Sequence, residues 1–281
     1  MKKMSIFAFA LIALAQPLFA ENVEKIASAG GDITEILFEI GVGDKVVAVD
    51  STSIFPEAVR ELPGIGYVRE LSAEGVLSTG ANVLIGSHDM GTPAVMDNLK
   101  TAGMRVEFAP DGVGSQRYVD KVNFVARILG RETRGAEMID TYNSAISQVT
   151  TRAKALSRKP RVLMLLSVRD GSPIAAGRDT TGHDMIEVTG GQNMASFEGW
   201  KPMNSEAIIA AAPDIILMSS LHLERIGGLD VIMGRPDIGA TPSGENQAYA
   251  VLSPQMMLQF GPRSPIAMND IITAYEGLDL N

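Results

Sequence analysis

The chain has 281 residues, of which 46% are hydrophobic and 20% charged, with a formal net charge of −9 and no cysteine. This acidic balance argues against binding to nucleic acid or to an anionic membrane surface. Without cysteine we expect no disulfide, no thiolate metal site and no lipid-modified cysteine.

Residues 1–20 have the pattern of a secretory signal peptide. Lys2 and Lys3 precede an apolar run over 4–15, and small Ala20 follows the helix breaker Pro17. We expect cleavage after Ala20, which would take the formal charge from −9 to −11. The run is too short to span a membrane comfortably. We therefore predict a soluble periplasmic protein that is not a lipoprotein and does not insert into the membrane.

Short aliphatic and β-branched runs, each followed by a helical pattern, recur through both halves of the chain. The predicted strands are 45–49, 83–85, 105–108, 161–166, 215–218 and 248–252. This alternation predicts an α/β fold whose lobes have mostly parallel central sheets.

A long helix is predicted between the two halves, over about 131–157. Its apolar stripe is formed by Ile139, Tyr142, Ile146, Val149, Ala153 and Leu156. At 1.5 Å per residue such a helix is roughly 40 Å long, enough to join two lobes side by side. We predict a first lobe over 21–130, a connecting helix over 131–158 and a second lobe over 159–281.

A tyrosine and an arginine stand two residues apart in the segment Gly66-Tyr67-Val68-Arg69. If this segment is extended, both side chains point the same way, and the Arg69 guanidinium favours the deprotonated form of Tyr67. A phenolate is a ligand for ferric iron, and tyrosine is a known axial ligand of haem. The alternative is a half-buried tyrosine that caps a turn.

An internal repeat links the halves. Residues 72–85 align without gaps to 204–217, which places Glu74 and Glu206 at the same register. Each copy predicts an N-cap, a glutamate in the first helical turn, a short helix and a buried strand. A local alternative is that each glutamate only stabilises its own helix dipole.

The chain resembles the periplasmic haem-binding proteins of bacterial ABC importers, among the substrate-binding proteins whose lobes are joined by one long helix. The resemblance covers essentially the whole mature chain and implies two Rossmann-like lobes joined by a single long α-helix, with a ligand cleft between the lobes. The matching segments are 26–37, 66–75, 175–181, 204–207 and 260–265. The opening segment and the repeat are shared with cobalamin and siderophore binders, whereas Gly-Tyr-x-Arg is the haem-specific segment.

The resemblance implies roles for individual residues. Tyr67 matches the axial iron ligand, and Arg69 matches the arginine that hydrogen-bonds to it. Glu74 and Glu206 match the pair that meets arginines on the permease dimer. Some relatives carry a second axial histidine where this chain has Val168. We therefore expect a five-coordinate or weakly six-coordinate iron, or a substitute ligand.

Histidines could supply that substitute. His88 and His222 each follow a predicted strand, at the edge where open α/β sheets bind ligands. The alternative for each is an exposed loop histidine. His183 falls in a predicted helix and is a weaker candidate. Three dispersed histidines do not favour a bare transition-metal site.

Other side chains suit the remainder of a porphyrin. Arg169, Arg178 and Arg263 lie in predicted loops, where they could pair with propionates, although surface arginine is the ordinary alternative. Met90, Met256 and Met257 could form soft walls, although core filling is the commoner use of methionine.

We predict a non-enzymatic protein that captures ferric haem and delivers it to an inner-membrane ABC permease with its ATPase, so that the protein serves iron uptake. The sequence lacks the serine-elbow, phosphate-loop and zinc-helix motifs of common enzymes. A cobalamin or ferric-siderophore binder of the same fold stays open as an alternative. A metal-dependent enzyme using the cleft and a purely structural adaptor are further alternatives.

Overall fold

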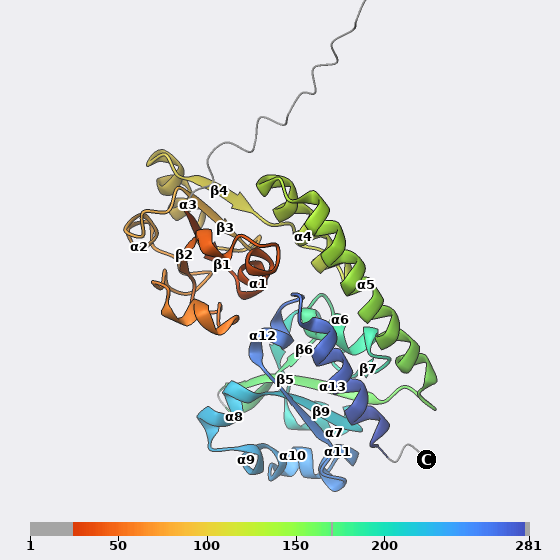
Figure 1. Cartoon of the computed structure of the whole chain (residues 1–281). Coiled ribbons are helices and arrows are strands. Elements are labelled where there is room, and N and C mark those ends of the chain that lie inside the picture. The colour runs from red at the N-terminus through yellow and green to blue at the C-terminus, as the bar shows by residue number, and fades with distance from the viewer. Residues whose placement is uncertain (1–24, 170, 279–281) are drawn as a thin grey trace, which may run out of the picture.

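The computed structural model describes residues 25–169 and 171–278, which form two lobes lying along one long helix (Figure 1). The predicted signal peptide, residues 1–20, lies outside the described residues. Within the described ranges no helix is both long and apolar enough to cross a membrane.

The first lobe is built on a parallel sheet of four strands in the order β2-β1-β3-β4. The strands are β1 (Ile26–Ala29), β2 (Val46–Val49), β3 (Val83–Gly86) and β4 (Arg105–Phe108). The covering elements are α1 (Gly31–Glu39), η1 (Gly43–Lys45), η2 (Glu57–Glu61), α2 (Ala73–Leu77), α3 (Pro93–Thr101) and α4 (Gln116–Leu129). Two buried hydrophobic clusters fill the space between the sheet and these helices.

Helix α5 (Glu132–Ala155) contributes to the cores of both lobes. Met138 and Tyr142 are buried in the core of the first lobe, whereas Val149 is buried in that of the second. The ring of Tyr142 stacks on Tyr118 with centroids 4.0 Å apart. Because its side chains are packed into both cores, α5 resists large displacement of either lobe along it.

The second lobe is built on a mixed sheet in the order β10-β9-β5-β6-β8, with β7 paired to β5. The strands are β5 (Arg161–Arg169), β6 (Ser172–Ala176), β7 (Gln192–Asn193), β8 (Trp200–Pro202), β9 (Ile215–Ser219) and β10 (Tyr249–Leu252). The helices are α6 (Thr181–Val188), α7 (Ser205–Ala211), α8 (Ser220–Ile226), α9 (Leu229–Met233), α10 (Pro236–Gly239), α11 (Pro242–Glu245), α12 (Pro254–Leu258) and α13 (Ser264–Glu276).

The predicted fold class is confirmed, with one difference in the second sheet. All six predicted strands are present, and the parallel pairs β10-β9 and β9-β5 agree with the expected pattern. Strand β5 continues to Arg169, however, and pairs antiparallel with β6, which in turn pairs antiparallel with β8. The second sheet is therefore mixed, because a hairpin extends it on one side.

The internal repeat is realised as two equally capped helices. The Ser72 hydroxyl accepts a hydrogen bond from the Gly75 amide at 2.9 Å at the start of α2. The Asn204 side-chain oxygen accepts one from the Ala207 amide at 2.8 Å at the start of α7. These bonds satisfy an otherwise unpaired amide and fix where each helix begins.

Candidate functional site

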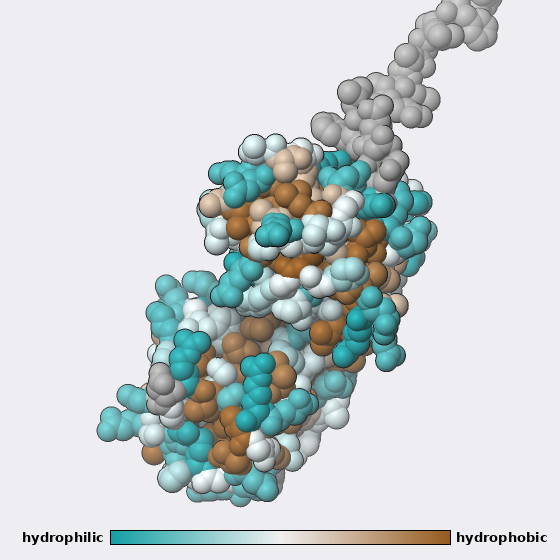
Figure 2. Space-filling view, turned by 90° about the vertical axis from the view of Figure 1, so that its left-hand side faces the viewer, coloured by the Kyte–Doolittle hydropathy of each residue, from teal (hydrophilic) through white to brown (hydrophobic). Residues whose placement is uncertain are grey.

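A cleft of about 550 Å³ lies between the lobes, and side chains from both lobes line it. Figure 2, which views the molecule from the side opposite α5, shows a hollow between the two lobes with hydrophobic surface inside it. The volume is within the range of small-molecule and cofactor sites. Apolar lining is supplied by Val68, Leu166, Ile174, Trp200, Pro202 and Leu258.

Tyr67 lies at this cleft on a tight turn. The carbonyl of Gly66, whose φ is +94°, accepts a hydrogen bond from the Ser51 amide at 2.8 Å. The Tyr67 carbonyl accepts one from the Glu70 amide at 2.8 Å. The side chain itself is 44% exposed. The backbone of Tyr67 is thus fixed from two sides while its ring is open to a ligand.

The turn corrects one expectation. We expected an extended segment with Arg69 beside the phenol of Tyr67, but the bond between residues 67 and 70 closes a turn instead. The Nε atom of Arg69 donates to Asp89 Oδ2 at 2.7 Å. The Ser87 hydroxyl donates to the other oxygen of Asp89 at 2.8 Å. The rest of the guanidinium keeps N–H donors for a further acceptor.

Asp89 is suited to hold this arginine because it remains ionised. Burial raises the pKa of Asp89, but the Ser87 hydrogen bond and the Arg69 guanidinium outweigh burial and hold it below its usual range. Asp89 and Ser87 were not among the predicted site residues. Both lie in the loop that begins directly after β3, at the strand edge that had singled out His88, so the same rule could have found them.

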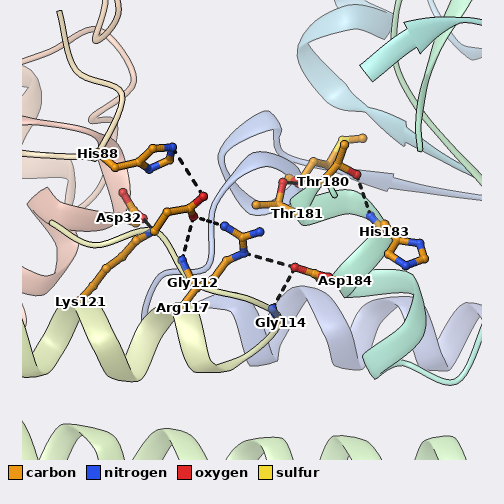
Figure 3. A network of polar contacts seen from close by, with 12 residues as sticks. Asp32, His88, Gly112, Gly114, Arg117, Lys121, Thr180, Thr181, His183 and Asp184 are labelled. Carbon is orange, nitrogen blue, oxygen red and sulfur yellow. Dashed lines mark hydrogen bonds and ion pairs between the residues drawn. The ribbon is translucent and has the colours of Figure 1, made fainter. Parts of the chain in front are cut away.

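His88 also lines the cleft and begins a chain of polar contacts that crosses between the lobes (Figure 3). Its Nε2 lies 3.7 Å from Asp111 Oδ2, and Asp111 pairs with Arg117 at the start of α4. Arg117 Nε donates to Asp184 of α6 at 3.2 Å. The Gly114 amide donates to the same carboxylate at 2.9 Å. We call Arg117 and Asp184 the cleft tie.

A buried ion pair lies at the edge of the cleft. Lys121 of α4 donates to Asp32 in the first turn of α1, and both side chains are almost fully buried. The pair links two helices of the first lobe. Because removal of either partner would leave an uncompensated buried charge, its first role is structural.

The predicted arginines separate into three environments. Arg169 lines the cleft and has no ion pair with any residue that the structure describes. Arg178 is exposed and does not line the cleft. Its Nη2 atom lies 3.6 Å from Glu198 Oε1. Arg263 bonds to Glu35 of the first lobe at 2.6 Å and packs over the Phe55 ring at 4.0 Å.

Arg263 is therefore engaged between the lobes, away from the cleft lining. Gln255 adds a second bond across the lobes, from its amide to Glu35 Oε1 at 2.7 Å. We call Glu35 and Arg263 the second tie. Burial raises the pKa of Glu35 above its ordinary value although the Arg263 contacts act in the opposite direction.

The remaining candidates lie away from the cleft lining. His183 bonds through Nδ1 to Asn193 at 3.2 Å inside the second lobe. The Nε2 of His222 is buried without a hydrogen-bond partner in the described structure, and burial together with Arg225 lowers the pKa of this histidine. Met90 and Met257 are buried in the hydrophobic cores. Met256 lies beside Glu35 and Arg263 in a separate small hollow.

Within the described ranges, His88 is the histidine that lines the cleft. No three histidine, aspartate or glutamate side chains in those ranges come together as a metal site. The stretch with Val168 contributes its neighbours Leu166, Ser167 and Arg169 to the cleft.

Comparison with known proteins identifies relatives of the whole fold. A family model described as "Periplasmic binding protein" matches residues 26–255. The periplasmic haem-binding protein RhuT from Roseiflexus sp. RS-1, in apo form, is 34% identical with a TM-score of 0.86. The match covers 90% of this chain and 98% of that one.

Curated relatives differ in their described ligands and attachment. An uncharacterised ABC transporter substrate-binding lipoprotein, YvrC of Bacillus subtilis, is 26% identical over 85% of this chain and 76% of its own length. A vitamin B12-binding protein of Vibrio vulnificus is 19% identical over 96% of both chains.

The lipoprotein relative corrects the prediction of location. We expected a periplasmic protein that is not a lipoprotein, and the match to YvrC contradicts that exclusion. The physical reason is that a two-lobe binding protein can present its cleft equally well free or on a lipid tether. The fold therefore does not determine the mode of attachment.

Proposed function

The chain belongs to the periplasmic binding protein family, and on that basis we propose that it captures ferric haem in the interlobe cleft and delivers it to an ABC permease. The family consists of substrate-binding proteins of transporters. The observation that carries the choice of haem is Tyr67, held on a fixed turn with its ring open to the cleft and Arg69 two residues away. The haem-binding relative at 34% identity supports the same cargo.

In this proposal Tyr67 binds the iron of the bound haem through its phenolate oxygen. Arg69, anchored by Asp89 through one edge, turns its free N–H donors toward that oxygen. A cationic donor near the phenolate stabilises its negative charge. His88 lies on the same lobe and is the candidate for a sixth, weaker ligand.

The two lobes have different tasks toward the porphyrin. Leu166, Ile174 and Trp200 of the second lobe offer apolar surface to the flat face of the ring. Arg169 offers a cation without a described partner, which suits a propionate at the rim. Arg117 already pairs with two carboxylates and is less available for that purpose.

Release requires the lobes to separate. The long helix α5 limits this to a small hinge movement, and both interlobe ties must loosen when the cleft opens. We propose that the permease drives this opening through Glu74 and Glu206, one from each lobe. Each carboxylate is exposed and has no hydrogen bond or ion pair with a described residue.

A ligand screen tests the cargo directly. The purified mature chain is titrated separately with haemin, cyanocobalamin and a ferric catecholate siderophore while its melting temperature is followed. Our proposal expects saturable stabilisation by haemin alone. If cyanocobalamin stabilised the chain and haemin did not, the cargo would be the vitamin, in line with the vitamin B12-binding relative.

A further inference from the structure

The two copies of the internal repeat each expose one large hydrophobic side chain, and they expose it at the same register. Leu77 of α2 is 40% exposed, and Ile209 of α7 is 44% exposed. In the gap-free alignment of 72–85 with 204–217, these two residues are equivalent. No other large hydrophobic residue of either segment is exposed to that degree.

Each of these side chains lies next to the exposed glutamate of its helix. Glu74 and Leu77 are three residues apart on α2, as are Glu206 and Ile209 on α7. Residues three apart share a helix face, with Cβ atoms about 5–6 Å from one another. We call each pair of glutamate and aliphatic residue a docking pair.

Each docking pair is exposed because another face of its short helix is buried in the core of the lobe. Val76 and Ile208, which immediately precede the exposed aliphatic residues, are completely buried in their lobes. The caps at Ser72 and Asn204 fix the helix starts. The outward direction of each docking pair is therefore set by the core and by the cap.

Single exposed hydrophobic residues are ordinary on protein surfaces. Recurrence at one register in both lobes is a different observation, because Glu74 and Glu206 form the only identical pair in this alignment and the exposed aliphatic pair recurs three residues after it. An exposed carboxylate beside an aliphatic side chain suits a partner with a basic group at the rim of an apolar socket. The two pairs lie on α2 and α7, one helix in each lobe (Figure 1), which suits a partner with two equivalent subunits.

We propose that Leu77 and Ile209 insert into matching apolar sockets, one on each subunit of the permease dimer, beside the basic groups that meet Glu74 and Glu206. This inference rests on the proposed transport function and adds the apolar half of the contact. The glutamates set orientation and encounter rate, and the aliphatic residues set how long the complex persists. Because both lobes must engage, the two contacts reinforce one another.

The test measures how the mature chain stimulates the ATPase of its cognate permease in lipid nanodiscs. The unmodified chain is compared with the single variants Leu77→Ser and Ile209→Ser and with the double variant. Burying the exposed part of one such side chain is equivalent to roughly a fivefold change in affinity. We expect the concentration for half-maximal ATPase stimulation to rise about fivefold for each single variant and about 25-fold for both together, because free-energy losses at two separate contacts add.

Matched controls are Val231→Ser on α9 and Ile266→Ser on α13, which are 50% and 54% exposed and lie outside the repeat. These should dock as the unmodified chain does, and Leu77→Ile should dock normally. Equal effects in the test and control variants, or an effect confined to one lobe, would overturn the proposal.

A haemin titration of every variant separates docking from cargo. We expect unchanged haemin affinity throughout. If the unmodified chain stimulates the ATPase but binds no haemin, the proposed cargo fails and the docking inference stands. If haemin binds and the variants dock normally, the docking inference fails alone.

Discussion

The guanidinium of Arg69 is bonded to Asp89, with Nε 2.7 Å from Oδ2, while Ser87 holds the other carboxylate oxygen. One edge of the arginine is thus fixed to the loop after β3. Arg69 and Tyr67 both line the cleft, and the proposed function requires a remaining N–H donor of Arg69 to reach the phenolate oxygen. In the proposed iron site, Asp89 is the residue that positions Arg69.

Replacing Asp89 by asparagine should weaken haemin binding about three- to tenfold, since an oriented charged hydrogen bond contributes about 1 kcal/mol at a partly exposed site. The ferric charge-transfer band should shift as Arg69 loses its anchor. Visible absorption during a haemin titration measures both effects. Asp97→Asn, exposed on α3, is the matched control. Tighter binding by Asp89→Asn would mean that Asp89 withholds the arginine from Tyr67.

Replacing Arg169 by alanine should weaken binding of haemin about five- to tenfold, because a propionate loses its cation. The same substitution should have little effect on haemin dimethyl ester, whose propionates are uncharged. Arg178→Ala is the control, since Arg178 is exposed and lies outside the cleft lining. An equal loss for both ligands would show that Arg169 contributes only packing.

Replacing Arg263 by alanine should lower the thermal stability and leave the spectrum of bound haem unchanged. Glu35 would remain buried without its partner, which typically costs about 3 kcal/mol. Burial already raises the pKa of Glu35. A carboxyl with a raised folded pKa favours its neutral form, so the penalty is full at neutral pH and diminishes as the pH falls through that pKa.

Melting temperatures of Arg263→Ala and the unmodified chain at pH 8 and pH 5 measure this dependence. The difference should be larger at pH 8. Arg178→Ala serves again as a surface control. A change in the haem spectrum would instead place Arg263 at the cargo.

Asp214 should stabilise the second lobe in a pH-dependent way. Its buried carboxylate accepts bonds from Arg158 and Arg161 at 2.7 and 2.8 Å. Burial raises the pKa of Asp214, but these contacts outweigh burial and hold it far below its ordinary value. A depressed folded pKa gives stability that is complete above the unfolded pKa of about 3.9 and is lost as the pH falls below it.

Asp214→Asn should therefore lower the free energy of unfolding by about 1–2 kcal/mol at pH 7, because it removes charge-assisted hydrogen bonds to two arginines that are themselves partly exposed. Urea unfolding at pH 7 and pH 3 measures the difference, which should shrink at the lower pH. Asp97→Asn controls for a general effect of charge. A difference that does not depend on pH would refute the electrostatic origin.

The strands and the long helix were predictable because their signal is local. The stripe from Ile139 to Leu156 and the run at 105–108 each specify an element by their own periodicity. The hairpin between β5 and β6 was not predicted. Whether a strand pairs parallel or antiparallel depends on its neighbour, and the pattern within β5 does not contain that information.

The site was predictable in part for the same reason. Tyr67 and Arg69 were chosen by motif, His88 by its strand edge and Arg169 by a predicted loop, and all four line the cleft, although Arg169 is the last residue of β5 and does not lie in a loop. From its position in a loop, Arg263 was predicted to lie at the rim of the cleft. In the structure it bonds to Glu35, which lies 228 residues away in sequence. Such a distant pairing depends on how the lobes dock, which local sequence patterns do not specify.

The most direct test of the account is a haemin titration of Tyr67→Phe beside the unmodified chain, followed by visible absorption. Tyr249→Phe is the matched control, because Tyr249 is similarly exposed at 39% but lies on β10 outside the cleft lining. We predict a ferric tyrosinate spectrum that is lost in Tyr67→Phe and kept in Tyr249→Phe. An unchanged spectrum in Tyr67→Phe would contradict the account and move the iron ligand elsewhere in the cleft, with His88 the next residue to replace.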